Sequence, residues 1–166
     1  MTTMLRLTNG NPKAWALWPM LETRVRAFCA TETPDTPSDA VIQHLRRLFL
    51  ESPDSLGAWV VLNEHGAMIG HLVGWVDLYW GCPYLLVHQA ALDQGQTLDP
   101  TKQAFMAALR QWGDTVNAQF EAAGRQERVA RVRWMTTRPE VWIRYFGHQP
   151  QQQTTVLELS LKEATL

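Results

Sequence analysis

The stretch that decides the fold runs from residue 84 to residue 123 and begins with YLLVHQAAL, residues 84–92. This near-continuous apolar run predicts a strand that is buried on both faces of a sheet. The loop DQGQTLD, residues 93–99, follows, and a long helix is predicted from Pro100 to a stop at Gly124. One stripe of that helix is apolar: Phe105, Leu109, Trp112, Val116 and Phe120.

Upstream, MLRL at residues 4–7 predicts a short strand. A first helix is indicated within residues 11–28, with Pro19 as a point where it kinks or breaks. A loop with two prolines, residues 31–39, leads to a second helix, on which Val41, Leu45 and Leu48 face inward. Two apolar runs at 57–63 and 67–78, separated by turn residues, then predict a β-hairpin.

Downstream, ARVRWMTT at residues 130–137 predicts a strand, PEVWIRYFGH at 139–148 a short helix, and TTVLELSL at 154–161 an alternating strand. The order is β-α-α-β-β-β-α-β-α-β. It predicts an α/β (α+β) fold, with a mixed sheet of about six strands and helices on both faces. The length of 166 residues fits a single domain over residues 1–166.

The composition is that of an ordinary globular protein, with 46% hydrophobic and 19% charged residues. The sequence shows no membrane-spanning run, no signal peptide and no disulfide framework, so we expect a cytoplasmic protein. Residues 101–166 carry nine lysines and arginines against six acids, an excess that gathers in an arginine-rich segment: Arg125, Arg128, Arg131, Arg133, Arg138 and Arg144. A solvated helix end and an exposed strand face account for it better than a nucleic-acid surface does.

The element order, the hairpin strand IGHLVG and the short helix ending in YFGH resemble the GNAT family of acetyl-coenzyme A-dependent N-acetyltransferases. The resemblance covers about residues 4–161 and lies in pattern rather than in signature residues. In that family two parallel central strands splay apart, and coenzyme A enters the gap between them. Here the resemblance implies that the splayed strands are those around residues 84–92 and 129–136.

The cofactor loop departs from the family. Its motif, Gln/Arg-x-x-Gly-x-Gly/Ala, wraps the pyrophosphate with backbone N–H groups. Counted from Gln94, the two glycine positions hold Thr97 and Asp99. Pro100 lacks an N–H, and Asp93 and Asp99 place carboxylates where a diphosphate would sit. We therefore expect no cofactor.

If the protein is nevertheless active, the resemblance implies acetyl-coenzyme A as cofactor, with contacts from Gly95, Gln96 and Lys102. The tyrosine that protonates the leaving thiolate in many family members falls at Ile143 here. Tyr145, two positions on, is the remaining candidate for that catalytic role, although packing accounts for it better.

Among the remaining groups, His88 and Asp77 lie nearest the expected acceptor site and are the candidate bases. A lone histidine in an apolar strand is more often a core residue, however, and a carboxylate at a strand end more often caps a turn. His65, His71, Cys82 and His88 do not match a metal-ligand spacing, so no metal is expected.

The segment WVDLYWGCPY, residues 75–84, is rich in aromatic side chains. Trp75, Tyr79, Trp80 and Tyr84 can form a ligand pocket or an anchor for another protein. Alternatively, Trp75 and Tyr84 belong to the core while Tyr79 and Trp80 cover the end of the sheet. Trp15 and Trp18 on the first helix favour the pocket if they flank the same groove.

Two functions follow from these patterns. The first is a degenerate GNAT-fold protein without catalysis, acting as a binding or assembly module through a protein partner or self-association. It is similar to the small GNAT-like proteins of bacteriophages, in which case the chain is a structural or virion-associated protein. The second is an active N-acetyltransferase with an atypical pyrophosphate loop. Neither requires a membrane, and the sequence does not favour a nucleic-acid partner.

Overall fold

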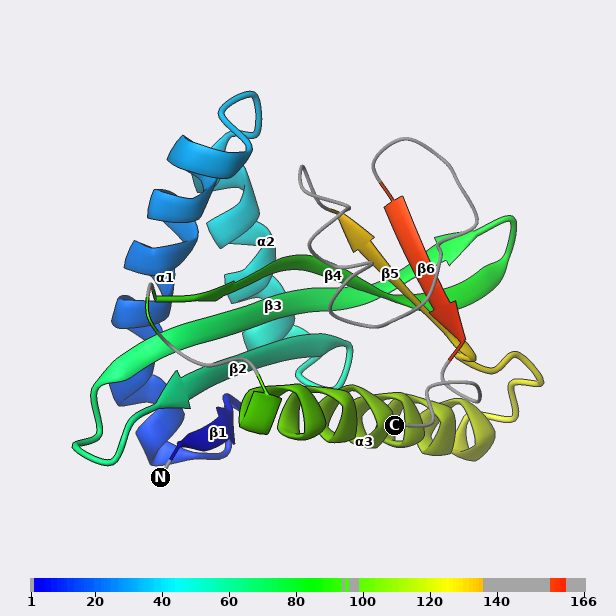
Figure 1. Ribbon diagram of the computed structural model, residues 1–166. Helices are drawn as coiled ribbons and strands as arrows, with labels where there is room; N and C mark the ends of the chain where they lie inside the picture. The colour runs from blue at the N-terminus through cyan, green and yellow to red at the C-terminus, as the bar shows by residue number, and fades with distance from the viewer. Residues whose placement is uncertain (1, 94, 96–98, 136–155, 161–166) are drawn as a thin grey trace.

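The computed structural model describes residues 2–93, 95, 99–135 and 156–160. Along the chain these residues form nine helices and strands (Figure 1): β1 Thr3–Arg6, α1 Pro12–Glu32, α2 Ser38–Glu51, β2 Leu56–Leu62, β3 Met68–Tyr79, β4 Cys82–Leu92, α3 Asp99–Ala122, β5 Arg131–Met135 and β6 Val156–Ser160. The predicted α/β order is confirmed for these elements. The short helix expected over residues 139–148 lies outside the described residues.

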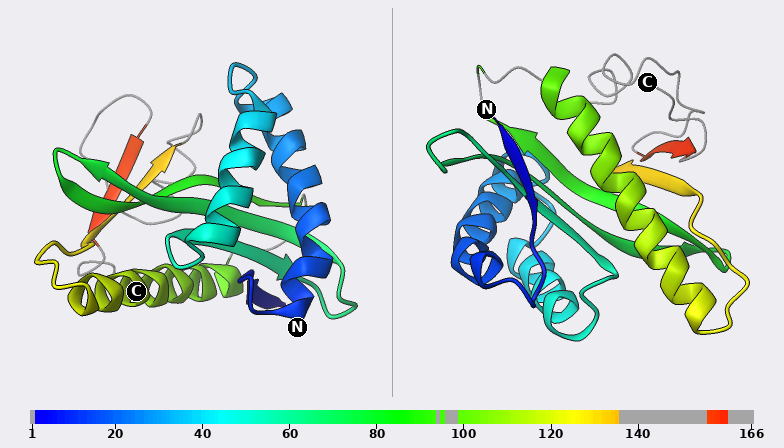
Figure 2. Two further views of the ribbon diagram at one scale, coloured as in Figure 1. Left: turned by 180° about the vertical axis from the view of Figure 1, so that it is seen from behind. Right: turned by 90° about the horizontal axis from the view of Figure 1, so that it is seen from below.

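The six strands form one mixed sheet in chain order, β1 to β6. Neighbouring strands pair antiparallel except β4 and β5, which are parallel. The helix α3 connects this parallel pair and covers one face of the sheet, whereas α1 and α2 cover the other face (Figure 2). This crossover is the strand–loop–helix unit that the sequence predicted.

Each face has its own apolar core, built from the stripes that the sequence displays. On one side, Trp18, Leu21 and Val25 of α1 pack with α2 and the sheet. On the other side, Leu109, Trp112 and Val116 of α3 pack against β3, β4 and β5. A break at Pro19 does not occur: α1 is continuous from Pro12 to Glu32. Burial of Trp18 and Leu21 on either side of Pro19 outweighs the loss of one helical hydrogen bond.

The parallel strands β4 and β5 stay together for only a short distance. Their register runs from Leu85↔Val132 to Val87↔Trp134, and β4 then continues to Leu92. Figure 1 shows the two strands starting at the same end and diverging. Such a divergence is what the family resemblance implied for this pair of strands.

A β-bulge lies where the divergence begins. Gly74 of β3 faces Val87 of β4, but the next residue of β3, Val73, faces Gln89, so His88 is the extra residue. A Cβ atom on Gly74 would lie 2.1 Å from the carbonyl oxygen of Leu86, so only glycine allows the strands to approach this closely. The bulge turns the side chains of both His88 and Gln89 toward α1 and α2, since one stacks on Trp75 and the other bonds to Cys29.

Candidate functional site

The strand–helix junction after β4 is held by an ion pair. Arg24 of α1 donates through Nη1 and Nη2 to the two carboxylate oxygens of Asp93, at 2.8 and 2.9 Å. Arg24 also donates to the carbonyl oxygen of Met68 at 2.5 Å. Hydrogen bonding to Arg24 lowers the pKa of Asp93. Arg24 of α1 therefore compensates the negative charge of Asp93. The sequence argument, in which this charge repels a diphosphate, did not predict the ion pair.

The described part of the junction does not fit a diphosphate well. The amide of Asp93 donates to the carbonyl oxygen of Ile69 at 2.9 Å, and Pro100, the second residue of α3, has no amide hydrogen. Gly95 has a φ of 82°, a conformation that suits glycine. Gln96 and the side chain of Lys102 lie outside the described residues. At these two positions the junction offers no amide to a phosphate, while residues 94 and 96–98 of the loop lie outside the described residues. The absence of a cofactor therefore stays a prediction.

At the bulge, His88 is enclosed by aromatic side chains. Only 5% of His88 is exposed, and its ring stacks on Trp75 with the centroids 5.0 Å apart. On α2, His44 contacts the same indole edge-on at 4.8 Å. The structure therefore brings together two of the predicted residues, His88 and Trp75. It adds His44, which the sequence analysis did not name.

The imidazole of His88 is poorly suited to take a proton from an ammonium group. Burial, with a further contribution from the neighbouring His44, lowers the pKa of His88 to about 4. A general base works best when its pKa lies near the operating pH. Among the described residues, the Nδ1 atom of His88 has no hydrogen-bond partner. His88 is thus buried and stacked on an aromatic ring, as expected if it is a core residue and not a base.

Asp77 and Tyr84 form a pair near the tip of the β3–β4 hairpin. The hydroxyl of Tyr84 donates to Oδ2 of Asp77 at 3.1 Å, and the amide of Leu78 donates to Oδ1 at 2.7 Å. Burial and the nearby Asp77 carboxylate raise the pKa of Tyr84. The guanidinium of Arg133 lies 4.5 Å from the centroid of the Tyr84 ring. Asp77 is thus bonded within its own hairpin and supports its end.

The tip of the same hairpin presents apolar side chains to solvent. Trp80 is 89% exposed and Leu78 is 58% exposed. Trp80 and Gly81 form the two-residue turn, and both have positive φ angles, 50° and 77°. A pair of positive φ values defines a type I′ turn, in which Asn-Gly is the favoured sequence and a bulky first residue is strained. The side chain of Tyr79 lies outside the described residues.

The aromatic residues of the first helix lie elsewhere. Trp18 is buried and stacks on Phe49 of α2 at 4.3 Å. Trp15 donates to the carbonyl oxygen of Asn9 and meets the edge of Phe49. These contacts are with the α1–α2 layer, so Trp15 and Trp18 stabilise that layer and give no support to a shared groove with the hairpin.

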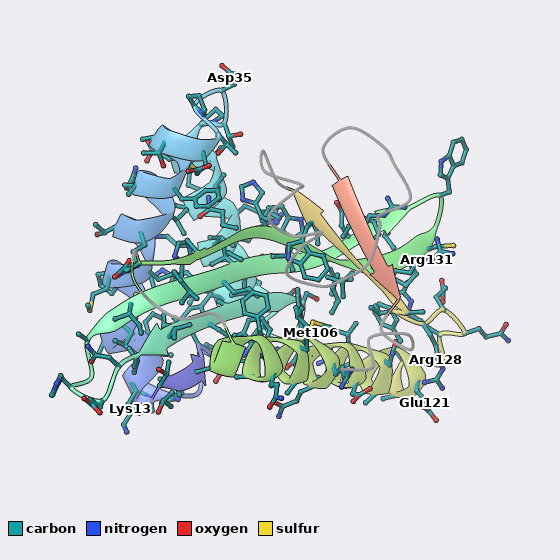
Figure 3. The ribbon with its side chains drawn as sticks, in the orientation of Figure 1. Lys13, Asp35, Met106, Glu121, Arg128 and Arg131 are labelled. Carbon is teal, nitrogen blue, oxygen red and sulfur yellow. The ribbon has the colours of Figure 1, made fainter. Side chains whose placement is uncertain are left out.

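The arginine-rich segment lies at the end of the molecule from which the hairpin projects, as the labelled Arg128 and Arg131 show (Figure 3). Arg128 pairs with Glu121 at 3.1 Å, and Arg125 pairs with Glu127 at 3.4 Å. These ion pairs reduce the positive field that the sequence suggests. Arg138 and Arg144 lie outside the described residues.

One surface hollow of about 260 Å³ lies between the α2–β2 loop and α3. Its lining includes the carboxylates of Glu51 and Asp54 and no cation, so it is unsuited to a phosphate. Across the described ranges, no three histidine, cysteine or acidic side chains are grouped as metal ligands would be. No helix in this part of the chain is both long and apolar enough to cross a membrane.

The sequence analysis did not identify two residues of the site, Arg24 and His44. Arg24 follows the buried Leu21 by three positions, and His44 follows the buried Val41 by three. A polar residue at that spacing lies beside the inward stripe and needs a partner there. This helical periodicity was the available signal, although it does not identify Asp93 or Trp75 as the partner.

No protein-family model and no curated protein sequence matches the chain. Solved structures do match its fold. Spermidine N-acetyltransferase from Vibrio cholerae, in complex with CoA and spermine, has a TM-score of 0.56 at 9% identity, over 98% of this chain and 97% of its own. The AtaT–AtaR complex bound to DNA gives 0.54 at 12% identity, over 98% and 96%. Tetrahymena GCN5 gives 0.51 at 15% identity, over 96% of each chain.

Identities this low show the fold alone. The fold is that of the GNAT acetyltransferases, as the sequence pattern predicted. The divergence of β4 from β5 after Val87 is the feature of this chain that corresponds to the family's splayed pair.

Proposed function

We propose that this chain uses the GNAT fold as a protein-binding module and does not transfer acetyl groups. The tip of the β3–β4 hairpin is the proposed binding surface, and Trp80 is its anchor. The proposal extends to the setting that the sequence suggests, an assembly component of a bacteriophage particle.

The observation that carries the proposal is the conformation of Trp80. A bulky residue in the left-handed region costs on the order of 1–2 kcal/mol. An exposed indole recovers little of this through burial, since 89% of Trp80 is accessible. Strained residues that the rest of a fold holds in place cluster at functional sites. Trp is also among the commonest residues that dominate binding energy at protein interfaces.

Two further features argue against acetyl transfer. Two positions at the β4–α3 junction supply no free amide to a phosphate, because Asp93 uses its own and Pro100 lacks one. His88 is buried and holds its proton too weakly to act as a base near neutral pH. Among the solved neighbours, AtaT is found in a complex with AtaR, so a GNAT fold is compatible with a protein partner.

Titration calorimetry with acetyl-coenzyme A tests the absence of a cofactor. We expect no binding at micromolar concentrations and no turnover when a small amine or an N-terminal peptide is added. One observation favours the alternative, an active N-acetyltransferase: Arg24 offsets the charge of Asp93 at the junction. Micromolar binding together with turnover would establish that alternative and overturn the proposal.

The partner surface is tested with Trp80→Asn. This substitution removes the indole but supplies the residue that a type I′ turn prefers, so the hairpin should remain folded. We expect at least tenfold weaker self-association in sedimentation, or loss of a partner that co-purifies from the native source. Leu50→Asn, which alters another exposed apolar residue on α2, is the control and should change neither. A monomeric wild-type protein without a co-purifying partner would contradict the proposal.

A further inference from the structure

Three histidines lie in the layer between the sheet and helices α1 and α2. His71 of β3 and His88 of β4 are 3% and 5% exposed, and His44 of α2 is half-buried. Each ring has one buried nitrogen without a hydrogen-bond partner among the described residues: Nε2 of His44, Nδ1 of His71 and Nδ1 of His88. The three rings therefore share one desolvated layer.

Their hydrogen bonds define two of the tautomers. Gln89 donates through Nε2 to the sulfur of Cys29 at 3.2 Å, so its Oε1 accepts, and Nε2 of His71 at 3.4 Å carries the proton. Arg47 lies 3.2 Å from Nδ1 of His44 and can only donate, so Nδ1 of His44 accepts and Nε2 carries the proton. Both rings are thus placed as neutral imidazoles.

The surroundings oppose a second proton on these rings. His44 and His88 contact the same indole, Trp75, so charging both would place like charges together in an apolar layer. Two arginines face the histidines as well: Arg47 beside His44, and Arg24 near His71.

Other groups facing the three rings do not reverse this effect. Asp77 acts on His44 and Asp93 acts on His71, and each favours the charged form. For both rings, desolvation by burial is the larger influence. The pKa of the Tyr84 hydroxyl is raised, so it adds no charge near neutral pH, and Asp93 is already paired with Arg24.

We propose that these three uncharged imidazoles hold α1 and α2 on the sheet, and that their protonation in mild acid releases the helical layer from β3 and β4. An opened layer would give each ring access to water, where the charged form is no longer penalised. The helix α3 packs on the other face and has no histidine, so it should stay in place while α2 opens.

The size of the effect follows from the pKa values of about 4 for His71 and His88, against 6.5 for an exposed imidazole. Between pH 7 and pH 5, each such ring should raise the opening equilibrium constant about twentyfold.

Hydrogen–deuterium exchange of the whole protein measures this opening, after correction for the intrinsic effect of pH on exchange. We expect the opening constant of α2 amides to rise at least tenfold from pH 7 to pH 5. At pH 5 it should exceed that of α3 amides by at least tenfold. One common opening constant for both helices at pH 5, or no effect of acid on α2, would overturn the proposal.

His88→Phe tests the origin of the effect, since it keeps an aromatic ring against Trp75 but cannot be protonated. It should reduce the acid response of α2 about twentyfold, whereas His65→Gln, in the exposed β2–β3 turn, should leave it unchanged. Equal responses in these two variants would contradict the proposal. If His88→Phe does not fold, ring titration of the wild-type protein by NMR decides: His71 and His88 must stay neutral down to pH 5.5.

Discussion

At the scale of single residues, the protein departs from local preference in two places, and they lie on the same hairpin. Gly74 allows β3 to approach the carbonyl of Leu86 where β4 bulges. Trp80 occupies a turn position that favours asparagine. The first departure has a structural reason, since the bulge opens the parallel pair. The second places an indole that is 89% exposed at the tip of the hairpin, where the proposed binding surface lies.

Trp80→Asn should make the isolated protein more stable. Asparagine adopts positive φ at lower cost than tryptophan, so the free energy of unfolding should rise by about 0.5–1 kcal/mol. Urea denaturation measures the change, and Trp80→Val, which is β-branched, should lower the same quantity. A loss of stability in the asparagine variant would mean that the indole contributes to the fold rather than to a partner.

Gly74→Ala should destabilise the sheet strongly. The new Cβ would lie 2.1 Å from the Leu86 carbonyl oxygen. Neither the Gly74 nor the Leu86 backbone can shift without breaking hydrogen bonds between β3 and β4. We expect the free energy of unfolding to fall by at least about 2 kcal/mol. Gly10→Ala is the matched control, because nothing lies within 4 Å of its added Cβ, and it should change stability by less than about 0.5 kcal/mol. Similar effects of the two substitutions would be inconsistent with a tight bulge.

At the scale of elements, the helices and strands follow from periodicity. The stripe of α3 predicted the burial of Leu109, Trp112 and Val116, because a helix must bury its apolar face. Local rules allowed a break or a kink at Pro19, and packing on both sides keeps α1 continuous there. They also could not predict the pair between Arg24 and Asp93, since contacts between residues 69 positions apart depend on the tertiary arrangement.

Asp93→Asn tests what this pair contributes to the attachment of α1. The pKa of Asp93 is lowered, so the ion pair stabilises the fold above the ordinary value of 3.8, and this contribution is lost as the pH falls through the folded value. Since 47% of the Asp93 side chain is exposed, we expect a loss of less than about 1 kcal/mol at pH 7. Urea denaturation of wild type and variant should give stabilities that converge as the pH falls below the lowered pKa of Asp93. A difference that persists there would assign the effect to packing instead of charge.

At the scale of the whole molecule, the six-stranded fold was predictable, but the chemistry of its central gap was not. The order of elements indicated a mixed sheet, the family resemblance implied a splayed parallel pair, and the pairing of β4 with β5 has that form. The one-residue shift that puts Gln89 on the same face as His88, toward Cys29 of α1, depends on the register between strands, which no local pattern encodes. The layer of histidines also depends on the tertiary arrangement, because His44 contacts Trp75 beside His88 only when α2 packs on that face.

Buried neutral histidines make the stability of the whole protein depend on pH. The folded pKa values of His71 and His88, about 4, lie below the ordinary 6.5, so the unfolded chain binds more protons between these values. Stability is then fully present above pH 6.5 and decreases as the pH falls toward 4. From pH 7 to pH 5, the free energy of unfolding should decrease by on the order of 2–4 kcal/mol.

Urea denaturation at several pH values measures this slope, and it should correspond to an uptake of nearly two protons near pH 5. The double variant His71→Gln, His88→Phe should lose most of the slope, whereas His65→Gln should keep it, because the exposed His65 ring is hydrated in both states. A flat profile between pH 7 and pH 5 in the wild-type protein would show that the two rings accept protons in the folded state. In that case the layer under α1 and α2 is hydrated, and His88 regains the properties of a possible base.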